Sequence, residues 1–304
     1  MTIKLHGLVA AVHTPFDLQG QLHLEVVVKQ AEYLLSKGVF TVFIGGSTGE
    51  SHSLTVDERL VLAQRWSDVV RGTKLQLVVH VGSNCITDAR HLASQAQTLH
   101  ADAISALAPS YFKPKSLDSL VSCCADIAGA APELPFYFYD IPVLTGVQFS
   151  MPEFLRLASA RISTLAGIKF TNSDLMSYQR CLHFENGRFD IPWGVDEYLL
   201  AALALGGVGG VGSSYNFAAP IYHRMIKAFH QNDLETARRE QFCSVQLIDL
   251  LSRFGYMGAA KTVMNFLGVD VGPARLPNTN LTAEEVTTLR KSLESLGFFD
   301  WVTS

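Results

Sequence analysis

The chain has 304 residues, and 48% of them are hydrophobic, which is enough for one large domain or two smaller ones with an ample core. Its formal net charge is only −4, and no basic stripe or run is present, so a nucleic-acid partner is not expected. No apolar run reaches the length of a membrane span and the first residues lack a signal-peptide pattern, so we expect no membrane partner.

Short apolar runs alternate with segments of helical periodicity along the first 231 residues. Capping residues mark some of the helix starts: Thr55 with Glu58 forms a predicted capping box, and Ser150 precedes a helix with an early proline. The predicted strands cover residues 9–16, 40–44, 75–81, 103–108, 134–139, 165–171, 189–195 and 208–211.

Eight strand–helix units in strict alternation indicate a parallel sheet, and eight is the number that closes a (β/α)8 barrel. A doubly wound open sheet is the alternative. After the barrel, three helices are predicted at 234–254, 259–267 and 282–296. The expected α/β architecture is therefore a (β/α)8 barrel over residues 1–231, followed by a C-terminal three-helix extension over residues 232–304.

Lys169 falls inside a predicted strand, near its C-terminal end, whereas the other lysines fall on predicted helix faces, in loops or at the chain start. A lysine is rarely fully buried unless it is paired or used in chemistry. Burial disfavours the charged ammonium form, and the neutral amine can attack a ketone or aldehyde to form a Schiff base. The alternative is a lysine whose stem packs at the strand end while its head reaches solvent.

Active sites of (β/α)8 barrels lie at the C-terminal ends of the strands, so polar residues at these ends are candidate site residues. We expect them to converge on Lys169. The glycine-rich loop 45–51 suits a carboxylate or phosphate held by backbone N–H groups, or is an ordinary turn. For Asp196 and Glu197 two roles are open: their side chains contact a ligand, or they cap the helix that follows. The candidates are Ser47, Thr48, Glu50, Tyr111, Tyr139, Thr171, Asp196, Glu197, Ser213 and Ser214.

Metal and cofactor signals are weak. No His-Glu-x-x-His or Cys-x-x-Cys motif is present, so no metal site is expected. Gly207, Gly209 and Gly212 have the spacing of a dinucleotide fingerprint, but a helical segment rather than a strand precedes them, and we expect no cofactor. The five cysteines lack paired spacings, which is typical of free thiols in a reducing, cytoplasmic protein.

Three motifs together resemble one enzyme family: Gly46-Ser-Thr-Gly-Glu50, Tyr139-Asp-Ile-Pro142 with Thr145-Gly146, and Gly167-Ile-Lys169. Their order and strand-end positions resemble the pyruvate-dependent class I lyases, the dihydrodipicolinate synthase / N-acetylneuraminate lyase family. The resemblance runs from the first strand through the C-terminal helices.

Within that family the synthase branch carries an arginine soon after the tyrosine that Tyr139 matches. Here Val143 and Leu144 fill that place. Segments 170–175, 194–197 and 212–216 instead resemble the N-acetylneuraminate lyase branch.

The resemblance implies a Schiff-base aldolase that reversibly cleaves a sialic acid to pyruvate and N-acetylmannosamine without a cofactor or metal. Lys169 would carry the Schiff base, and Tyr139 would move the proton of the C4 hydroxyl. Tyr111 would reach the site of a neighbouring subunit in a homotetramer. The residues implied to bind substrate are Ser47 and Thr48 at the pyruvyl carboxylate, and Thr171, Gly194, Asp196, Glu197 and Ser213 on the sugar side.

Two other functions stay open at this point. One is a different pyruvate-dependent aldolase of the family, which would act on a smaller 2-keto-3-deoxy sugar acid. The other is a non-catalytic barrel that binds a sugar acid or a partner. The paired acids Asp196 and Glu197 favour a polyhydroxylated substrate but do not define its length.

Overall fold

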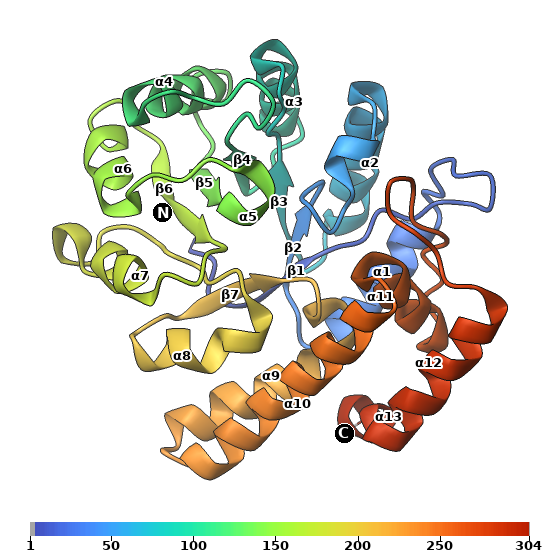
Figure 1. Ribbon diagram of the computed structural model, residues 1–304. Helices are drawn as coiled ribbons and strands as arrows, with labels where there is room; N and C mark the ends of the chain where they lie inside the picture. The colour runs from blue at the N-terminus through green and yellow to red at the C-terminus, as the bar shows by residue number, and fades with distance from the viewer. Residues whose placement is uncertain (1–3, 304) are drawn as a thin grey trace.

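The computed structural model describes residues 4–303 and forms a ring of parallel strands surrounded by helices (Figure 1). The sheet order is β6-β5-β4-β3-β2-β1-β7, and every pair is parallel. The strands are β1 (Gly7–Ala11), β2 (Thr41–Ile44), β3 (Gln76–His80), β4 (Ala103–Leu107), β5 (Phe136–Asp140), β6 (Leu165–Phe170) and β7 (Gly209–Gly212).

The segment 190–193 closes the ring between β6 and β7. On one side the Phe170 N–H donates to the Pro192 carbonyl at 2.9 Å, and on the other the Val211 N–H donates to the Trp193 carbonyl at 2.7 Å. Because proline has no N–H, the ladder is interrupted and the segment makes only isolated bridges. The predicted seventh strand is therefore reduced to bridges, yet it fills the remaining place in the barrel, and the open-sheet alternative is wrong.

Side chains of the strands alternate between the barrel interior and the helical layer, as a pleated strand requires. In β1, Val9 and Ala11 join the interior cluster with Phe43, whereas Leu8 and Ala10 belong to the cluster between strands and helices. The interior is filled by packed side chains. Active sites of this fold lie at the C-terminal mouth of the barrel, above this packed interior.

The outer layer consists of helices that follow the strands. Thr55 and Glu58 form the predicted capping box of α2. Ser150 is the N-cap of α6, although its side chain makes no capping bond and the first turn relies on Pro152 and Glu153. The helices are α1 (Val26–Ser36), α2 (Val56–Val70), α3 (Ile86–Thr98), α4 (Leu117–Ala128), α5 (Pro142–Thr145), α6 (Met151–Ala158), α7 (Leu175–Leu182), α8 (Leu199–Ala204) and α9 (Tyr215–His230).

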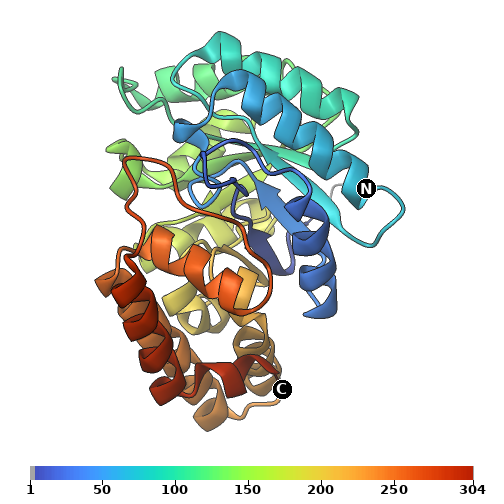
Figure 2. The same ribbon diagram turned by 90° about the vertical axis from the view of Figure 1, so that its right-hand side faces the viewer.

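The C-terminal extension gathers on one side of the barrel, opposite the teal and green helices in Figure 2. The three predicted helices are present, and Thr282 and Glu285 form the predicted capping box of α12. A fourth, α13, is too short to be detected from periodicity. Helix α10 packs against α9, and α11 packs against α10. The helices are α10 (Leu234–Arg253), α11 (Tyr256–Phe266), α12 (Ala283–Leu296) and α13 (Phe298–Thr303).

The cysteines are free thiols, as the sequence predicts. Cys124 and Cys181 are buried in the helical layer, whereas Cys85 is exposed at the start of α3. Within residues 4–303, no helix has the length and apolar character needed to cross a bilayer.

Candidate active site

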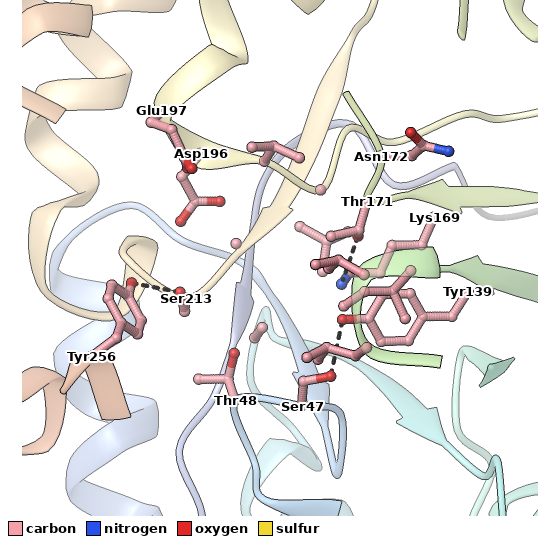
Figure 3. A pocket seen from close by; sticks show the side chains of 18 of the residues that line it. Ser47, Thr48, Tyr139, Lys169, Thr171, Asn172, Asp196, Glu197, Ser213 and Tyr256 are labelled. Atoms are coloured by element: carbon pink, nitrogen blue, oxygen red, sulfur yellow. Dashed lines mark hydrogen bonds between the residues drawn. The ribbon is translucent and has the colours of Figure 1, made fainter. Parts of the chain in front are cut away.

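A cavity of about 790 Å³ opens at the C-terminal ends of the strands (Figure 3). It brings together side chains from the loop after β2, from β5 and β6, and from the segments that follow 193 and β7. Two candidates stay outside its lining besides Tyr111: Glu50 and Ser214. The candidates that line it are Ser47, Thr48, Tyr139, Lys169, Thr171, Gly194, Asp196, Glu197 and Ser213.

Lys169 enters the cavity from inside the barrel, and only 3% of the residue is exposed. Its Nζ lies 3.6 Å from the centroid of the Tyr139 ring and 5.2 Å from that of Phe43. It donates to Thr171 Oγ1 at 3.4 Å. Lys169 and Tyr139 are register partners in β6 and β5, so strand pairing sets their spacing. The alternative of a lysine that reaches solvent is therefore wrong.

The Tyr139 side chain is held by two rings and faces a serine. Its hydroxyl oxygen lies 3.3 Å from Ser47 Oγ, and its ring meets Phe43 and His80 edge-on, with centroids 5.9 and 5.8 Å away. Burial holds the pKa of His80 well below its ordinary value, so the ring is neutral. Its Nδ1–H donates to the Gly45 carbonyl at 2.8 Å. His80, which the sequence analysis did not single out, thus connects Tyr139 to the loop that carries Ser47.

Glu50 was expected to converge on Lys169, but its side chain turns away from the cavity. The residue has a left-handed backbone with a φ of 56°. Its carboxylate pairs with Lys261 at 2.8 Å and accepts the backbone N–H of Arg275 at 2.8 Å. The acid of the Gly-rich motif therefore anchors the loop to the C-terminal extension instead of facing a ligand.

Lys261 is a second buried lysine. Lys261 lies on α11, a predicted helix face, and its side chain is 2% exposed. Burial lowers its pKa, and the ion pair with Glu50 acts in the opposite direction. Its Nζ also donates to the carbonyls of Thr14 and Pro273, at 3.0 and 2.8 Å. These bonds direct Lys261 away from the cavity lining.

The opposite wall of the cavity carries Asp196 and Glu197 (Figure 3). Asp196 Oδ2 accepts from the backbone N–H and the hydroxyl of Ser214, at 2.9 and 2.5 Å. Burial raises the pKa of Asp196 to about 6, and the two bonds from Ser214 act in the opposite direction. The next helix, α8, has Tyr198 as its N-cap, without a side-chain capping bond. Capping of α8 therefore does not account for the position of Asp196.

Two glycines make room for the polar side chains of this wall. A Cβ atom at Gly194 would overlap Thr171 Oγ1, and one at Gly212 would overlap the carboxylate of Asp196. Larger residues would have to displace these groups. The predicted lining glycine, Gly194, thus contributes space, which brings Thr171 and the segment after 193 together.

The C-terminal extension contributes to the cavity, which the sequence did not predict. Tyr256, at the start of α11, lines it, and its hydroxyl lies 2.7 Å from Ser213 Oγ. Asn278, from the loop before α12, also lines it, as do Asn172 and Gln148 of the barrel. Tyr256 falls between the predicted helices 234–254 and 259–267, and periodicity carries no signal that α11 begins at this residue and reaches the barrel mouth.

Tyr111 lies outside the cavity lining, and 78% of it is exposed. Its ring packs edge-on against Phe112, which is 86% exposed. Val143 and Leu144 of α5, at the cavity rim, are also largely exposed. Large apolar side chains thus follow β4 and β5 without burial in this chain.

Potential metal ligands do not gather at the cavity or elsewhere in the described part of the chain, where no group of three His, Cys, Asp or Glu side chains is found. What the arrangement offers is a buried primary amine, a tyrosine hydroxyl beside a serine, and a wall of acidic and hydroxyl groups. These groups can add to a carbonyl, transfer a proton, and bind hydroxyls.

The fold and the cavity define a (β/α)8 barrel with a lysine amine and a tyrosine hydroxyl at its active end. Comparison with protein families gives the particular group within this class. The chain belongs to the dihydrodipicolinate synthetase family, whose sequence profile matches residues 4–296.

Several relatives similar to this chain are N-acetylneuraminate lyases. It is 38% identical over 299 residues to the N-acetylneuraminate lyase of Mus musculus, covering 97% of this chain and 93% of the relative. It is 40% identical over 278 residues to N-acetylneuraminate lyase A of Xenopus laevis, covering 90% of each. The structure of Proteus mirabilis N-acetylneuraminate lyase matches with a TM-score of 0.94 at 38% identity, covering 97% of this chain and all of that one.

Proposed function

We propose that this chain is a class I aldolase that reversibly cleaves N-acetylneuraminate to pyruvate and N-acetylmannosamine through a Schiff base on Lys169. The observation that carries the proposal is the buried Lys169 amine over the Tyr139 ring, inside a cavity rich in polar groups. The similarity over nearly the full chain to lyases that are named for this substrate supports it.

The chemistry follows from the amine. Lys169 Nζ adds to the C2 ketone of the open-chain sugar and water leaves, which forms an iminium. The iminium draws electrons from the C3–C4 bond, and the Tyr139 hydroxyl relays the proton of the C4 hydroxyl to the neighbouring carboxylate of the pyruvyl part as this bond breaks. The aldehyde of N-acetylmannosamine departs. The remaining enamine takes a proton at C3, and hydrolysis releases pyruvate and the free amine.

The two sides of the cavity suit the two ends of the substrate (Figure 3). Ser47 and Thr48, with their backbone N–H groups, hold the carboxylate of the pyruvyl part beside Tyr139. The volume of the cavity, about 790 Å³, suits an extended sugar acid. The sugar side is formed by Thr171, Gly194, Asp196, Glu197 and Ser213.

The same proposal includes a homotetramer in which Tyr111 reaches the site of a neighbouring copy. Tyr111 and Phe112 are exposed next to each other, and Val143 and Leu144 are exposed at the cavity rim. Apolar patches of this kind are typical of protein–protein contacts. We place the protein in the cytoplasm, which the free thiols of all five cysteines support.

Trapping of the covalent intermediate tests the proposal. The protein is incubated with pyruvate and reduced with borohydride, and the adduct is mapped by mass spectrometry. We expect it on Lys169, with Lys261 as the internal control, because Lys261 is equally buried but engaged by Glu50. An adduct on Lys261, or none, contradicts the mechanism. Pyruvate release from a smaller 2-keto-3-deoxy sugar acid but not from N-acetylneuraminate contradicts the substrate.

A further inference from the structure

A row of buried polar groups extends from the cavity wall into the helical layer. Asp196 Oδ2 lies 2.5 Å from Ser214 Oγ, which lies 2.6 Å from the Tyr222 hydroxyl. The Tyr222 hydroxyl in turn lies 2.7 Å from Ser244 Oγ. Ser214 is the N-cap of α9, Tyr222 lies on α9, and Ser244 lies on α10. Ser214, Tyr222 and Ser244 are fully or almost fully buried.

The direction of these hydrogen bonds follows from the carboxylate at their end. An ionised Asp196 only accepts, so the Ser214 hydroxyl donates to it. Because that proton is then engaged, the Tyr222 hydroxyl donates to Ser214, and the Ser244 hydroxyl donates to Tyr222. All three O–H groups point toward Asp196. Hydrogen bonds aligned in this way polarise one another and strengthen the bond to the carboxylate.

The row holds one carboxylate oxygen of Asp196, a residue that lines the cavity. Oδ2 receives the Ser214 hydroxyl and backbone N–H. Oδ1 lies over Gly212, where a Cβ atom would overlap it. The carboxylate therefore has a fixed orientation, and among the hydrogen bonds of residues 4–303 those to its side chain are received by Oδ2. Such preorganisation lowers the cost of ordering the acceptor when the ligand binds.

We propose that Ser214, Tyr222 and Ser244 are positioning residues that hold Asp196 as an ionised, oriented acceptor for hydroxyl groups of the sugar, a role that rests on the proposed function. None of the three lines the cavity. They act through Asp196, whose pKa burial raises and the bonds from Ser214 lower. The titratable groups that face Asp196 are Glu197, Lys169, Tyr215, Tyr222 and Tyr256.

The chain offers a matched pair of tyrosines for the test. Tyr222→Phe keeps the ring and removes the hydroxyl in the middle of the row. Tyr215→Phe is the control, because the Tyr215 ring packs edge-on against Tyr222 with centroids 4.6 Å apart, and within the described residues its buried hydroxyl has no hydrogen-bond partner. The two variants lose the same atom at neighbouring sites. Only Tyr222→Phe interrupts the bonds to Asp196.

We expect Tyr222→Phe to lower kcat/KM for N-acetylneuraminate roughly tenfold, the worth of one buried hydrogen bond. The acid limb of its pH profile should shift upward, because Asp196 is more easily protonated. Borohydride trapping of pyruvate should stay at the wild-type level, since the pyruvyl end does not reach Asp196. Tyr215→Phe should match the wild type in all three measurements, and equal behaviour of the two variants overturns the proposal.

A second readout does not depend on catalysis. The carboxyl band of Asp196 is followed by infrared spectroscopy as pH is varied, and Asp196→Asn assigns the band. We expect its midpoint to rise by about one pH unit in Tyr222→Phe but not in Tyr215→Phe, and an unchanged midpoint overturns the proposal. A wild-type protein that does not cleave N-acetylneuraminate refutes the proposed function, whereas the infrared result still decides the role of the row. If Tyr222→Phe does not fold, Ser244→Ala should show a smaller shift in the same direction.

Discussion

Lys261 of α11 and Glu50 of the loop after β2 form an ion pair 2.8 Å long, with side chains that are 2% and 0% exposed. The pair joins the C-terminal extension to the loop that carries Ser47 and Thr48. A buried ion pair adds little net stability compared with apolar packing, but removal of one partner leaves an unpaired charge in the interior. The extension therefore contacts the loop beside the cavity through an ion pair, and removal of either partner should lower the stability of the protein.

Lys261→Met should lower the free energy of unfolding by about 3–5 kcal/mol, because Glu50 keeps its charge without its ion-pair partner. Denaturant titration measures the loss. The double variant with Glu50→Gln should be more stable than Lys261→Met alone, since the uncompensated charge is gone. A single variant as stable as the wild type would mean that solvent reaches Glu50 and that the pair does not anchor the loop.

Tyr139→Phe should separate proton transfer from capture of the ketone. The ring keeps its edge contacts with Phe43 and His80, so packing should change little. Lys169 remains, and pyruvate should still be trapped by reduction. Turnover should fall roughly 10²–10⁴-fold, the usual contribution of a positioned acid–base group. If turnover is unchanged, the proton moves through another group, and Tyr139 only packs against Lys169.

The sequence was sufficient to predict the barrel and the strand ends at which the candidate site lies. Few folds are compatible with this alternation of apolar runs and helical segments in a chain of this length. In a parallel barrel the C-terminal ends of all strands lie at the same end of the fold. The positions of Lys169 and Tyr139 in neighbouring strands follow from that argument. The interruption of the closing strand could also be predicted from the sequence, because Pro192 has no N–H to donate to a neighbouring strand.

Side-chain direction in loops and contacts from distant segments could not be predicted in the same way. Glu50 turns away from the cavity because its backbone is left-handed, which its neighbours in the sequence do not require. Tyr256 and Lys261 reach the barrel only through the packing of α11, a long-range contact without a local pattern. His80 reads as an ordinary strand residue, although it packs against Tyr139.

The preference for a long substrate should depend on pH. Burial raises the pKa of Asp196 to about 6, so its carboxylate is protonated as pH falls through that value and no longer accepts with full charge. We expect the ratio of kcat/KM for N-acetylneuraminate to that for a smaller 2-keto-3-deoxy acid to decrease as pH is lowered from 7.5 to about 5.5. The ratio cancels the steps at Lys169 that the two substrates share. A ratio that is constant over this range contradicts a role of Asp196 in binding the tail.

Catalysis should not require a metal ion, because the iminium on Lys169 supplies the electron withdrawal that a Lewis acid would otherwise provide. Full activity is expected after exhaustive chelation and gel filtration. The check is pyruvate release before and after treatment, with zinc and magnesium added back separately. Loss of activity that either ion restores would place the protein in a different mechanistic class.

Glu197→Ala should affect long substrates selectively. Glu197 is half-buried at the cavity wall, where its carboxylate can accept from the hydroxyl-rich tail of a sialic acid. Removal of this carboxylate should weaken transition-state binding of N-acetylneuraminate by about 1–3 kcal/mol, the contribution of hydrogen bonds to charged groups, and kcat/KM should fall accordingly. The kcat/KM for a smaller keto-deoxy acid should decrease little. Pyruvate trapping at Lys169 should not change, because Ser47 and Thr48 hold that end.

Glu197→Gln is the matched control, since it keeps the shape and one acceptor oxygen while it removes the charge, and its loss should be intermediate. The alternative function of Glu197, support of the helix that follows, predicts a different pattern: a lower melting temperature and equal losses on long and short substrates. Kinetics on both substrates and a melting curve for each variant distinguish the two. Since the N-cap of α8 is Tyr198, we expect unchanged melting temperatures and a loss confined to the long substrate.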